Sequence, residues 1–497
     1  MISTLLDASS IADYEKFLRI KSLPVCRFIG STAQYPDEYE AAVSGKKRPK
    51  RAASAQEISS FLFDYQRAIV EIAIRKRRFC VFADCGLGKT LIFLEYVRLV
   101  ADMMPQDQCA LIVSPLMVTN QTVDECEKFY GDSLRIHRVP SNEINQFLSG
   151  EGPRIGITNF EAFSKPVNRG RLGCLVIDES SMLKSHYGKW GTSLVELGRG
   201  VEWKLALTGT PAPNDRIEYA NHGVLMDAYP NVNSFLAKYF VNRGQTDGRW
   251  ELKPHALEGF YKDISHWCIF LTDPRTYGWK DNVEDLPPIN VHIHDVPMTD
   301  EQTEMAQDKT GDLMVVNLGG ISSRSKLATI SKGFSGKERI ESMKPAFIRS
   351  LVDSWPTEST IIWCLYNEEQ RILEETIPDA ESITGETPLA EREGIISDFK
   401  AGRCKTLITK PKILGFGLNL QIATRQIFSG LQDSYESYYQ AVKRSNRYGA
   451  KHPLNIHIPV TSMERPMIDT VISKAARVQR DAEEQERIFK DAAPNWK

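Results

Sequence analysis

The sequence has no run of about twenty apolar residues and no closely paired cysteines. Without such a run, no membrane span is expected. Its nine cysteines are scattered and none forms a C-x-x-C pair, which argues against a zinc site or a disulfide framework and favours reduced thiols. The first residues, MISTLLDASSIADYEKF, carry early acidic residues and no long apolar stretch, unlike a signal peptide. We therefore expect a cytoplasmic protein.

An excess of charge of either sign is also missing, since the formal net charge is −2 and the sequence pI is about 6.5. This excludes a chain that is basic throughout, but it allows a local basic groove for phosphate groups. The length of 497 residues indicates more than one domain, because single cores stop growing well below it.

Short apolar runs alternate with helix-like segments in two separate blocks. The first block contains FCVFAD (79–84), LIVSP (111–115), IGITN (155–159), CLVID (174–178) and KLALTG (204–209). The second contains TIIWC (360–364), ESITG (381–385), TLIT (406–409), RQIFS (425–429) and LNIHIPV (454–460). Continuous apolar runs of this length are typical of buried parallel strands. The sequence therefore predicts an α/β protein with two parallel-sheet lobes.

These blocks suggest five segments. Residues 1–55 form an N-terminal extension with an exposed tether, KKRPKR (46–51), followed by a first lobe over 56–213. Residues 214–284 form a mainly helical insertion and linker, whose aromatic residues Trp250, Tyr261, Trp267 and Trp279 are its expected core. DLPP (285–288) opens the second lobe, which covers 285–465, and 466–497 is a helical tail that packs back on the lobes.

The stretch ADCGLGKT (83–90) is close to the phosphate-loop pattern G-x-x-x-x-G-K-[ST]. Ala83 stands at the first glycine position, whereas Gly88, Lys89 and Thr90 fit. The stretch follows a predicted strand and precedes a predicted helix, as a phosphate loop requires. A chance GKT is the alternative, but this context favours a phosphate site.

An acidic pair, Asp178 and Glu179, follows the predicted strand CLVID. In a nucleotide site the first carboxylate would serve Mg²⁺ and the second would activate the attacking water. The alternative is an acidic pair favoured at a helix start by the helix dipole. Together with the phosphate loop upstream, the pair favours hydrolysis.

Two further segments carry polar residues suited to a nucleotide site. KLALTGTPAPN (204–214) ends a strand with Thr208, Gly209 and Thr210, which would relay the state of the γ-phosphate. In YYQAVKRSNRYGAK (438–451), helical spacing places Gln440, Arg444 and Arg447 on one face. In isolation, this last segment would be read as a solvated basic helix.

In order along the chain, these segments resemble the motor of superfamily-two helicases, and most closely its Swi/Snf-type branch of duplex-DNA translocases. The matching series is LFDYQRA (62–68), ADCGLGKT (83–90), LIVSPLMVTNQTVDECEKF (111–129), ITNFEAF (157–163), IDESSMLKS (177–185), LTGTPAPN (207–214), STIIWCLYNEEQ (359–370), ITGETPLAEREGIISDFKAG (383–402), ITKPKILGFGLNLQIA (408–423) and QAVKRSNRYG (440–449). The resemblance implies two RecA-like lobes. A first P-loop position other than glycine is common in this branch.

The resemblance implies a role for each matching residue of an ATP and Mg²⁺ site. Gln66 would read adenine, and the phosphates would be bound by Gly86, Leu87, Gly88 and Lys89. Thr90 and Asp178 would serve Mg²⁺, and Glu179 would be the catalytic base. From the second lobe, the finger segment would be supplied by Gln440, Arg444 and Arg447, and Gly417 would help to close the site. Motif II usually ends in His or Asp, but here Ser181 stands at that position. Serine donates a hydrogen bond but carries no charge.

The same resemblance implies a nucleic-acid track on the backbone phosphates, independent of sequence. Its expected residues are Ser114, Pro115, Thr158, Asn159, Thr384 and Gly385. Duplex or branched DNA is favoured, with single strands or RNA as alternatives, and compact forms of this kind occur in phages and prophages, which implies the bacterial cytoplasm and nucleoid. The basic run RKRR (75–78) is better explained as a helix end.

Two other functions remain open from the sequence. One is a helicase that separates DNA or RNA strands. The other is an ATP-gated DNA clamp or motor subunit that recruits a partner such as a nuclease, with residues 1–55 and 464–497 as docking segments. His292 and His294 alternate along VHIHDV without a third ligand, so exposed strand histidines are expected there.

Overall fold

The computed structural model describes residues 2–21, 23, 26–36, 39–44, 57–150, 152–184, 189–212, 215–242, 250–280, 286–310, 321–414, 418–431, 435–447 and 449–492. The chain divides into two compact units, Met1–Val283 with Asp481–Lys497, and Glu284–Arg480. The tether at 46–51 lies outside the described residues.

A seven-stranded parallel sheet forms the centre of the first unit, in the order β12-β4-β9-β8-β5-β7-β6. Its strands are β4 (Arg78–Ala83), β5 (Cys109–Ser114), β6 (His137–Arg138), β7 (Ile155–Asn159), β8 (Leu172–Ile177), β9 (Trp203–Thr208) and β12 (Cys268–Leu271). The five strands predicted here are confirmed. Because all seven run in parallel, the loops that follow them gather at one edge.

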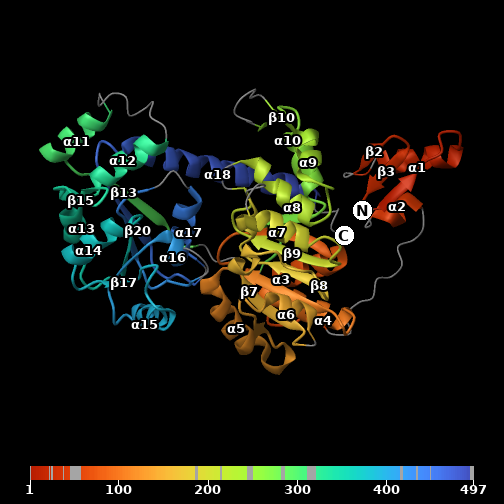
Figure 1. The fold of residues 1–497 in the computed structure, drawn as a ribbon, viewed down its shortest axis with the longest axis horizontal. Helices are drawn as coiled ribbons and strands as arrows, with labels where there is room; N and C mark the ends of the chain where they lie inside the picture. Colours follow the sequence, from red (N-terminus) through yellow and green to blue (C-terminus); the bar gives the residue numbers. More distant parts are fainter. Residues whose placement is uncertain are drawn as a thin grey trace. The chain divides into compact units, whose positions relative to one another are not determined.

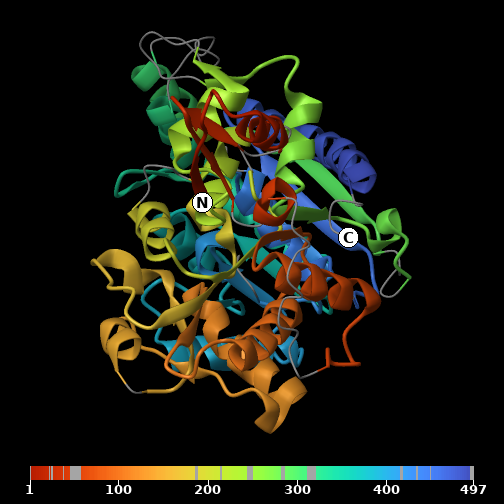
Figure 2. The same ribbon diagram turned by 90° about the vertical axis from the view of Figure 1, so that its right-hand side faces the viewer.

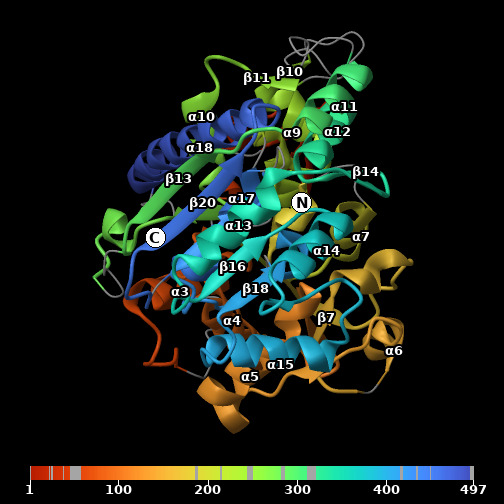
Figure 3. The same cartoon turned by 90° about the vertical axis from the view of Figure 1, so that its left-hand side faces the viewer.

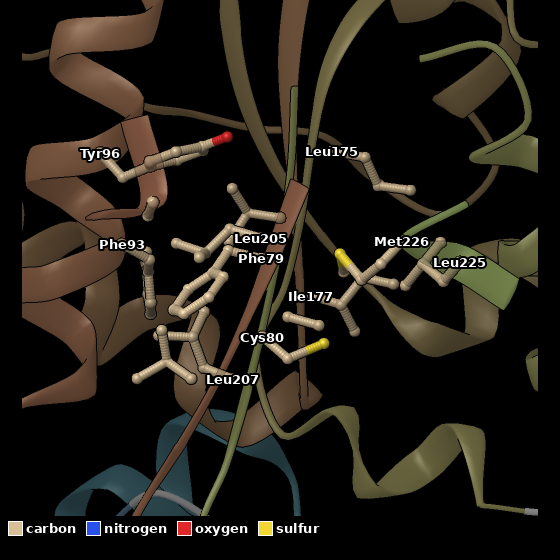
Figure 4. Packing of buried hydrophobic residues seen from close by; sticks show 14 of the residues in the cluster. Phe79, Cys80, Phe93, Tyr96, Leu175, Ile177, Leu205, Leu207, Leu225 and Met226 are labelled. Carbon is tan, nitrogen blue, oxygen red and sulfur yellow. The ribbon is translucent and has the colours of Figure 1, made fainter. Parts of the chain in front are cut away.

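Both faces of this sheet are buried, as its continuous apolar strands require. Figure 4 shows Phe79 of β4 turned toward Phe93 and Tyr96 of α4, while the next residue, Cys80, points to the opposite face. Between residues 57 and 280, the described helices of this unit are α3 (Asp64–Lys76), α4 (Lys89–Met103), α5 (Leu116–Tyr130), α6 (Ile144–Ser149), α7 (Lys189–Leu197), α8 (Tyr219–Leu225), α9 (Val232–Tyr239) and α10 (Leu257–Ile264).

The expected helical insertion over 214–284 differs in the structure. It contains α8, α9 and α10, but it also contains the hairpin of β10 (Phe240–Asn242) and β11 (Trp250–Leu252), and it ends in β12. β12 pairs with β4 and completes the sheet edge, so this segment is part of the first lobe. Its buried Tyr261 and Trp267 belong to the main core. The prediction of a mainly helical segment missed β12 because a four-residue apolar run does not distinguish a strand from a buried helix.

The described residues between Ile2 and Ser44 fold into a small element with its own core, drawn in red in Figures 1 and 2. An antiparallel sheet of β1 (Ile2–Leu5), β3 (Thr32–Tyr35) and β2 (Arg27–Ile29) packs with α1 (Ile11–Lys21) and α2 (Glu40–Ser44). Ile20, Tyr35 and Val43 are buried in it. The sequence indicated an extension here and gave no sign of this sheet.

The second unit has a six-stranded parallel sheet in the order β13-β20-β19-β16-β18-β17, visible in Figure 3. Its strands are β13 (Ile289–Asp295), β16 (Thr360–Trp363), β17 (Glu381–Ser382), β18 (Thr406–Thr409), β19 (Arg425–Phe428) and β20 (Leu454–Val460). Its helices are α11 (Asp300–Thr310), α12 (Ile321–Ser331), α13 (Met343–Asp353), α14 (Asn367–Thr376), α15 (Leu389–Lys400), α16 (Pro411–Leu414) and α17 (Tyr435–Ser445), with a hairpin of β14 (Phe334–Ser335) and β15 (Glu338–Arg339). The five strands predicted for this lobe are confirmed.

The two histidines of β13 differ in exposure. His292 is exposed, but His294 is half-buried, and its Nε2 lies 2.9 Å from Nδ1 of the buried His457 on β20. The expectation is therefore wrong for His294, because parallel pairing with β20 brings a third histidine beside it. Within the described ranges, no cluster of three or more His, Cys, Asp or Glu is suited to a metal ion.

The tail is one long helix, α18 (Arg465–Ala492). Its last part belongs to the first unit, where Phe489 is buried in the core and Glu486 accepts a hydrogen bond from the Asp273 amide. None of the helices in the described part of the chain is both long and apolar enough to cross a membrane.

Candidate functional site

The stretch ADCGLGKT forms a loop between β4 and α4, at the edge where the parallel strands end. Gly86 and Gly88 have φ values of 91° and 64°, a left-handed region in which side chains are disfavoured. α4 begins at Lys89, directly after the loop. Lys89 Nζ donates to the carbonyl oxygens of Ala83 at 3.0 Å and Asp84 at 3.2 Å. A strand, a glycine loop and a helix N-terminus are the parts of a phosphate cradle.

Gln66 of α3 is hydrogen-bonded to this loop. Its Nε2 donates to the carbonyl oxygens of Leu87 at 3.3 Å and Gly88 at 3.5 Å, and its Oε1 accepts from the Phe63 amide at 2.9 Å. Gln66 is only 1% exposed and Leu87 is also buried. The amide thus has hydrogen-bond partners on the protein, and the reading of adenine by Gln66 stays a prediction.

Gly88→Ala is expected to destabilise the first unit by about 1–3 kcal/mol, the usual cost of a left-handed conformation in a residue other than glycine. A Cβ at Gly88 would lie 2.3 Å from Gln66 Nε2, so the amide would also have to leave the loop. Thermal or urea unfolding measures the loss. Gly259→Ala in α10 is the matched control, since nothing lies within 4 Å of its Cβ position, and it should be neutral or stabilising. Equal effects of the two substitutions would contradict the prediction.

The acidic pair lies at the end of β8, two strands from β4 in the sheet. Asp178 is 6% exposed, and its Oδ2 accepts a hydrogen bond of 2.9 Å from Ser114 Oγ on the neighbouring β5. Burial and the adjacent Glu179 carboxylate raise the pKa of Asp178 to about 7, although Ser114 and the charge of Lys89 oppose this. Glu179 is 7% exposed and has a left-handed backbone with φ 50° and ψ 50°.

These two buried carboxylates make no salt bridge with any residue that the structure describes. Such a pair fits a divalent cation, since Mg²⁺ commonly takes one or two protein oxygens and keeps several waters. Thr90 and Asp178 are the residues that would hold it.

Ser114 and Thr158, two of the expected nucleic-acid contacts, are buried in the structure, and their contact with nucleic acid stays a prediction. Ser114 is 0% exposed and Thr158 is 2% exposed, so neither offers a surface to a partner. Ser114 is the last residue of β5, and Thr158 is the residue before the last of β7. Ser114 instead orients Asp178.

The other four residues predicted for this track lie nearer the surface. Pro115 and Asn159 are half-buried at the ends of β5 and β7, and Asn159 caps the short helix η3 (Phe160–Ser164) by accepting from the Glu161 amide. In the second unit, Thr384 is half-buried and accepts from the Thr387 amide at 3.2 Å, while Gly385 is exposed. Whether they contact nucleic acid stays a prediction.

The segment with Thr208, Gly209 and Thr210 lies between the two halves of the site, because β9 is hydrogen-bonded to β4 on one side and β8 on the other. A Cβ at Gly209 would lie 3.5 Å from the Ala83 carbonyl oxygen, so β9 ends against the phosphate loop. Thr208 Oγ1 accepts from the Thr210 amide at 3.2 Å, which holds this turn.

In the second unit, Gln440 and Arg444 lie on α17 and are both 3% exposed. Arg444 Nε donates to the Gln440 carbonyl oxygen at 3.0 Å. Arg447 lies beyond the end of α17, so the prediction of one continuous helical face is wrong for it: the helix ends at Ser445. Gly417 lies outside the described residues.

One side chain at the site was missed by the sequence analysis. His222 of α8 is 0% exposed and its Nε2 lies 3.0 Å from Oγ of Ser180, the residue after Glu179. A single histidine in a short helix gives no pattern from which this contact could be predicted.

Comparison with known proteins agrees with this architecture. The model of the SNF2-related domain matches residues 65–344, and that of the helicase conserved C-terminal domain matches residues 343–449. The mouse DNA annealing helicase and endonuclease ZRANB3 is 22% identical over 428 residues, which are 80% of this chain and 38% of that protein. Protein p41 of Acyrthosiphon pisum secondary endosymbiont phage 1 is 23% identical over 438 residues, 79% of this chain and 91% of p41.

A third relative, the mouse DNA repair and recombination protein RAD54B, is 22% identical over 496 residues, 83% of this chain and 54% of that protein. The chain thus spans between a third and just over half of the two mouse relatives, and nearly all of the phage protein. Because the SNF2-related model alone matches more than half of its length, the chain belongs to the SNF2-related family.

Proposed function

We propose that this protein is a DNA-dependent ATPase that couples ATP hydrolysis to movement along duplex or branched DNA. One observation carries the proposal: β4, β9 and β8 are adjacent in one parallel sheet, so the Lys89 loop, the Thr208–Thr210 turn and the Asp178–Glu179 pair meet at its edge. Ligands of open α/β sheets bind outside the carboxyl ends of the strands.

In this proposal each residue at the edge of the sheet has its own role. Lys89 and the amides of the glycine loop bind the phosphates. Thr90 and Asp178 hold Mg²⁺, which when bound neutralises charge on the phosphate oxygens. Glu179 accepts a proton from the attacking water. The raised pKa of Asp178 supports this reading, since a buried acidic pair without a salt bridge gains most from a cation.

From the second unit, we propose Gln440, Arg444 and Arg447 as the finger segment and Gly417 as a residue that helps to close the site. An arginine that reaches the γ-phosphate stabilises charge in the transition state. In the structure, the Arg444 guanidinium donates hydrogen bonds to two backbone carbonyl oxygens of its own unit, those of Gln440 and Leu418.

The nucleic acid of the proposal is DNA, because relatives along most of the chain are named for DNA annealing and for DNA repair and recombination. The proposed contacts to the DNA backbone that are accessible are Asn159, Pro115, Thr384 and Gly385. Contacts to phosphates alone give tracking without sequence preference.

A second candidate is an ATP-gated clamp or motor subunit that recruits a partner protein such as a nuclease. The N-terminal element favours it, because Leu5, Ile11 and Tyr14 are 76%, 80% and 59% exposed. Apolar side chains gathered on one small element are typical of a protein contact.

The steady-state ATPase rate, measured with no nucleic acid and with duplex DNA, single-stranded DNA and RNA of equal length, tests the proposal. We expect stimulation by duplex DNA, and displacement of a triplex-forming strand during turnover. Preference for single strands with strand separation would indicate a helicase. Very slow turnover with tight ATP-dependent DNA binding would indicate the clamp, and a rate that no nucleic acid changes would refute the translocase.

A further inference from the structure

The turn that follows the acidic pair is held at both ends by α8. This turn is the short helix η4 (Ser180–Leu183). At its start, Ser180 Oγ is hydrogen-bonded to His222 Nε2 at 3.0 Å; at its end, the Leu183 carbonyl oxygen accepts from Asn221 Nδ2 at 2.6 Å. All four residues are buried. Two adjacent side chains of α8 therefore fix the segment that begins directly after Glu179.

Glu179 needs such support because its backbone is left-handed, with φ 50°. For a residue other than glycine this conformation is strained, and it persists only where the surroundings enforce it. The neighbouring Ser181 does not supply that support, since its buried hydroxyl has no hydrogen-bond partner among the described residues. Ser180 is the serine of this turn that is anchored through its side chain.

His222 also contacts the strand that leads into the phosphate loop. Its ring packs edge-on against Phe82 of β4, with ring centroids 5.2 Å apart, and Phe82 is the residue before Ala83. Burial lowers the pKa of His222 to about 4, so the ring is neutral near pH 7 and adds no charge beside the acidic pair. The histidine thus packs on one half of the site and hydrogen-bonds to the other.

We propose that His222 is a positioning residue, which through Ser180 holds the backbone of Glu179 in the conformation that hydrolysis requires. The inference rests on the proposed function, since it assigns Glu179 as the base. Small displacements of a catalytic group reduce the rate of the chemical step more than they reduce ground-state binding. The effect should therefore fall on kcat and not on the KM for ATP.

Four variants of the full chain test the proposal: His222→Leu, His222→Gln, Ser180→Ala and the Ser180→Ala/His222→Leu double variant. Glutamine is the matched control, because its terminal amide can replace Nε2 as the partner of Ser180. We expect His222→Leu and Ser180→Ala each to lower kcat about tenfold with KM changed less than about twofold, His222→Gln to recover most of the rate, and the double variant to be no slower than either single one.

Amide hydrogen exchange over residues 178–183 gives a readout that does not depend on turnover. It should be faster in His222→Leu and Ser180→Ala than in the wild type and His222→Gln, because the turn opens locally more often. Ser180→Ala removes one oxygen atom only, so it keeps the test available if His222→Leu does not fold.

The proposal is overturned if kcat and exchange are both unchanged in Ser180→Ala, if glutamine is as slow as leucine, or if the two single effects multiply in the double variant. A wild type without ATPase activity would instead refute the proposed function. Hydrogen exchange would still decide whether His222 holds the turn.

Discussion

Glu179→Gln is expected to lower kcat by about 10²–10⁴-fold, the usual contribution of a general base. Glutamine has the size of glutamate and can adopt the same backbone, but it cannot take a proton from water. Removing a charge beside Asp178 should leave ATP binding intact or tighten it, because the burial of two carboxylates is already unfavourable. Single-turnover hydrolysis and equilibrium binding of ATP measure the two effects separately.

Glu196→Gln is the control for this substitution. Glu196 is an exposed residue of α7 paired with Arg199, so its loss should change kcat by less than about twofold, as for other exposed pairs. Lys89→Ala should differ from both, because it should weaken ATP binding as well as catalysis. A Glu179→Gln variant that turns over at the wild-type rate would exclude Glu179 as the base.

Glu464→Gln is expected to destabilise the second unit by about 3–5 kcal/mol, the usual cost of removing one partner from a buried ion pair. Glu464 lies between Lys332 and Lys344, and all three side chains are at most 3% exposed. Burial alone would raise the pKa of Glu464, but the charges of the two lysines outweigh it and lower the pKa. Glutamine would remove the carboxylate that is paired directly with both buried lysines.

The loss of stability in Glu464→Gln should depend on pH. A carboxyl whose folded pKa is lowered stabilises the protein above its unfolded pKa, near 4.5, and loses that contribution as the pH falls through the folded pKa. The difference in unfolding free energy between wild type and Glu464→Gln should therefore be largest near pH 7 and shrink below pH 4.5. Urea unfolding at several pH values measures it.

Two further variants check that burial is the cause. Glu375→Gln breaks an exposed pair with Arg339, so it should change the free energy of unfolding much less than Glu464→Gln does. Lys344→Met should cost less than Glu464→Gln, because a neutral Lys332–Glu464 pair remains and burial already lowers the pKa of Lys344 to about 8. Equal costs for Glu464→Gln and Glu375→Gln would contradict the explanation.

The sequence was sufficient to place most strands of the two parallel sheets. Ten strands could be placed from continuous apolar runs, since a buried parallel strand shows its character in four to six consecutive residues. The glycine loop and the acidic pair could be located because each directly follows such a strand. The order of these segments along the chain was enough to indicate the family.

Tertiary structure alone decided which strands are neighbours and which side chains therefore meet. Ser114 was predicted to contact nucleic acid, but β5 lies beside β8 and the serine is buried against Asp178. Arg447 lies beyond the last turn of α17. The run at Cys268–Leu271 is an edge strand because it forms hydrogen bonds with the side of β4 that faces away from β9.

The contact between His222 and Ser180 has the same origin. The two residues are 42 positions apart, and nothing local in either segment shows that α8 covers the turn after β8. Spacing along a chain reports the period of one helix or strand, whereas contacts between elements depend on how their buried faces pack. The sequence by itself thus determined ten strands and the loops that carry the proposed chemistry, and only the packed sheet decided what holds those loops in place.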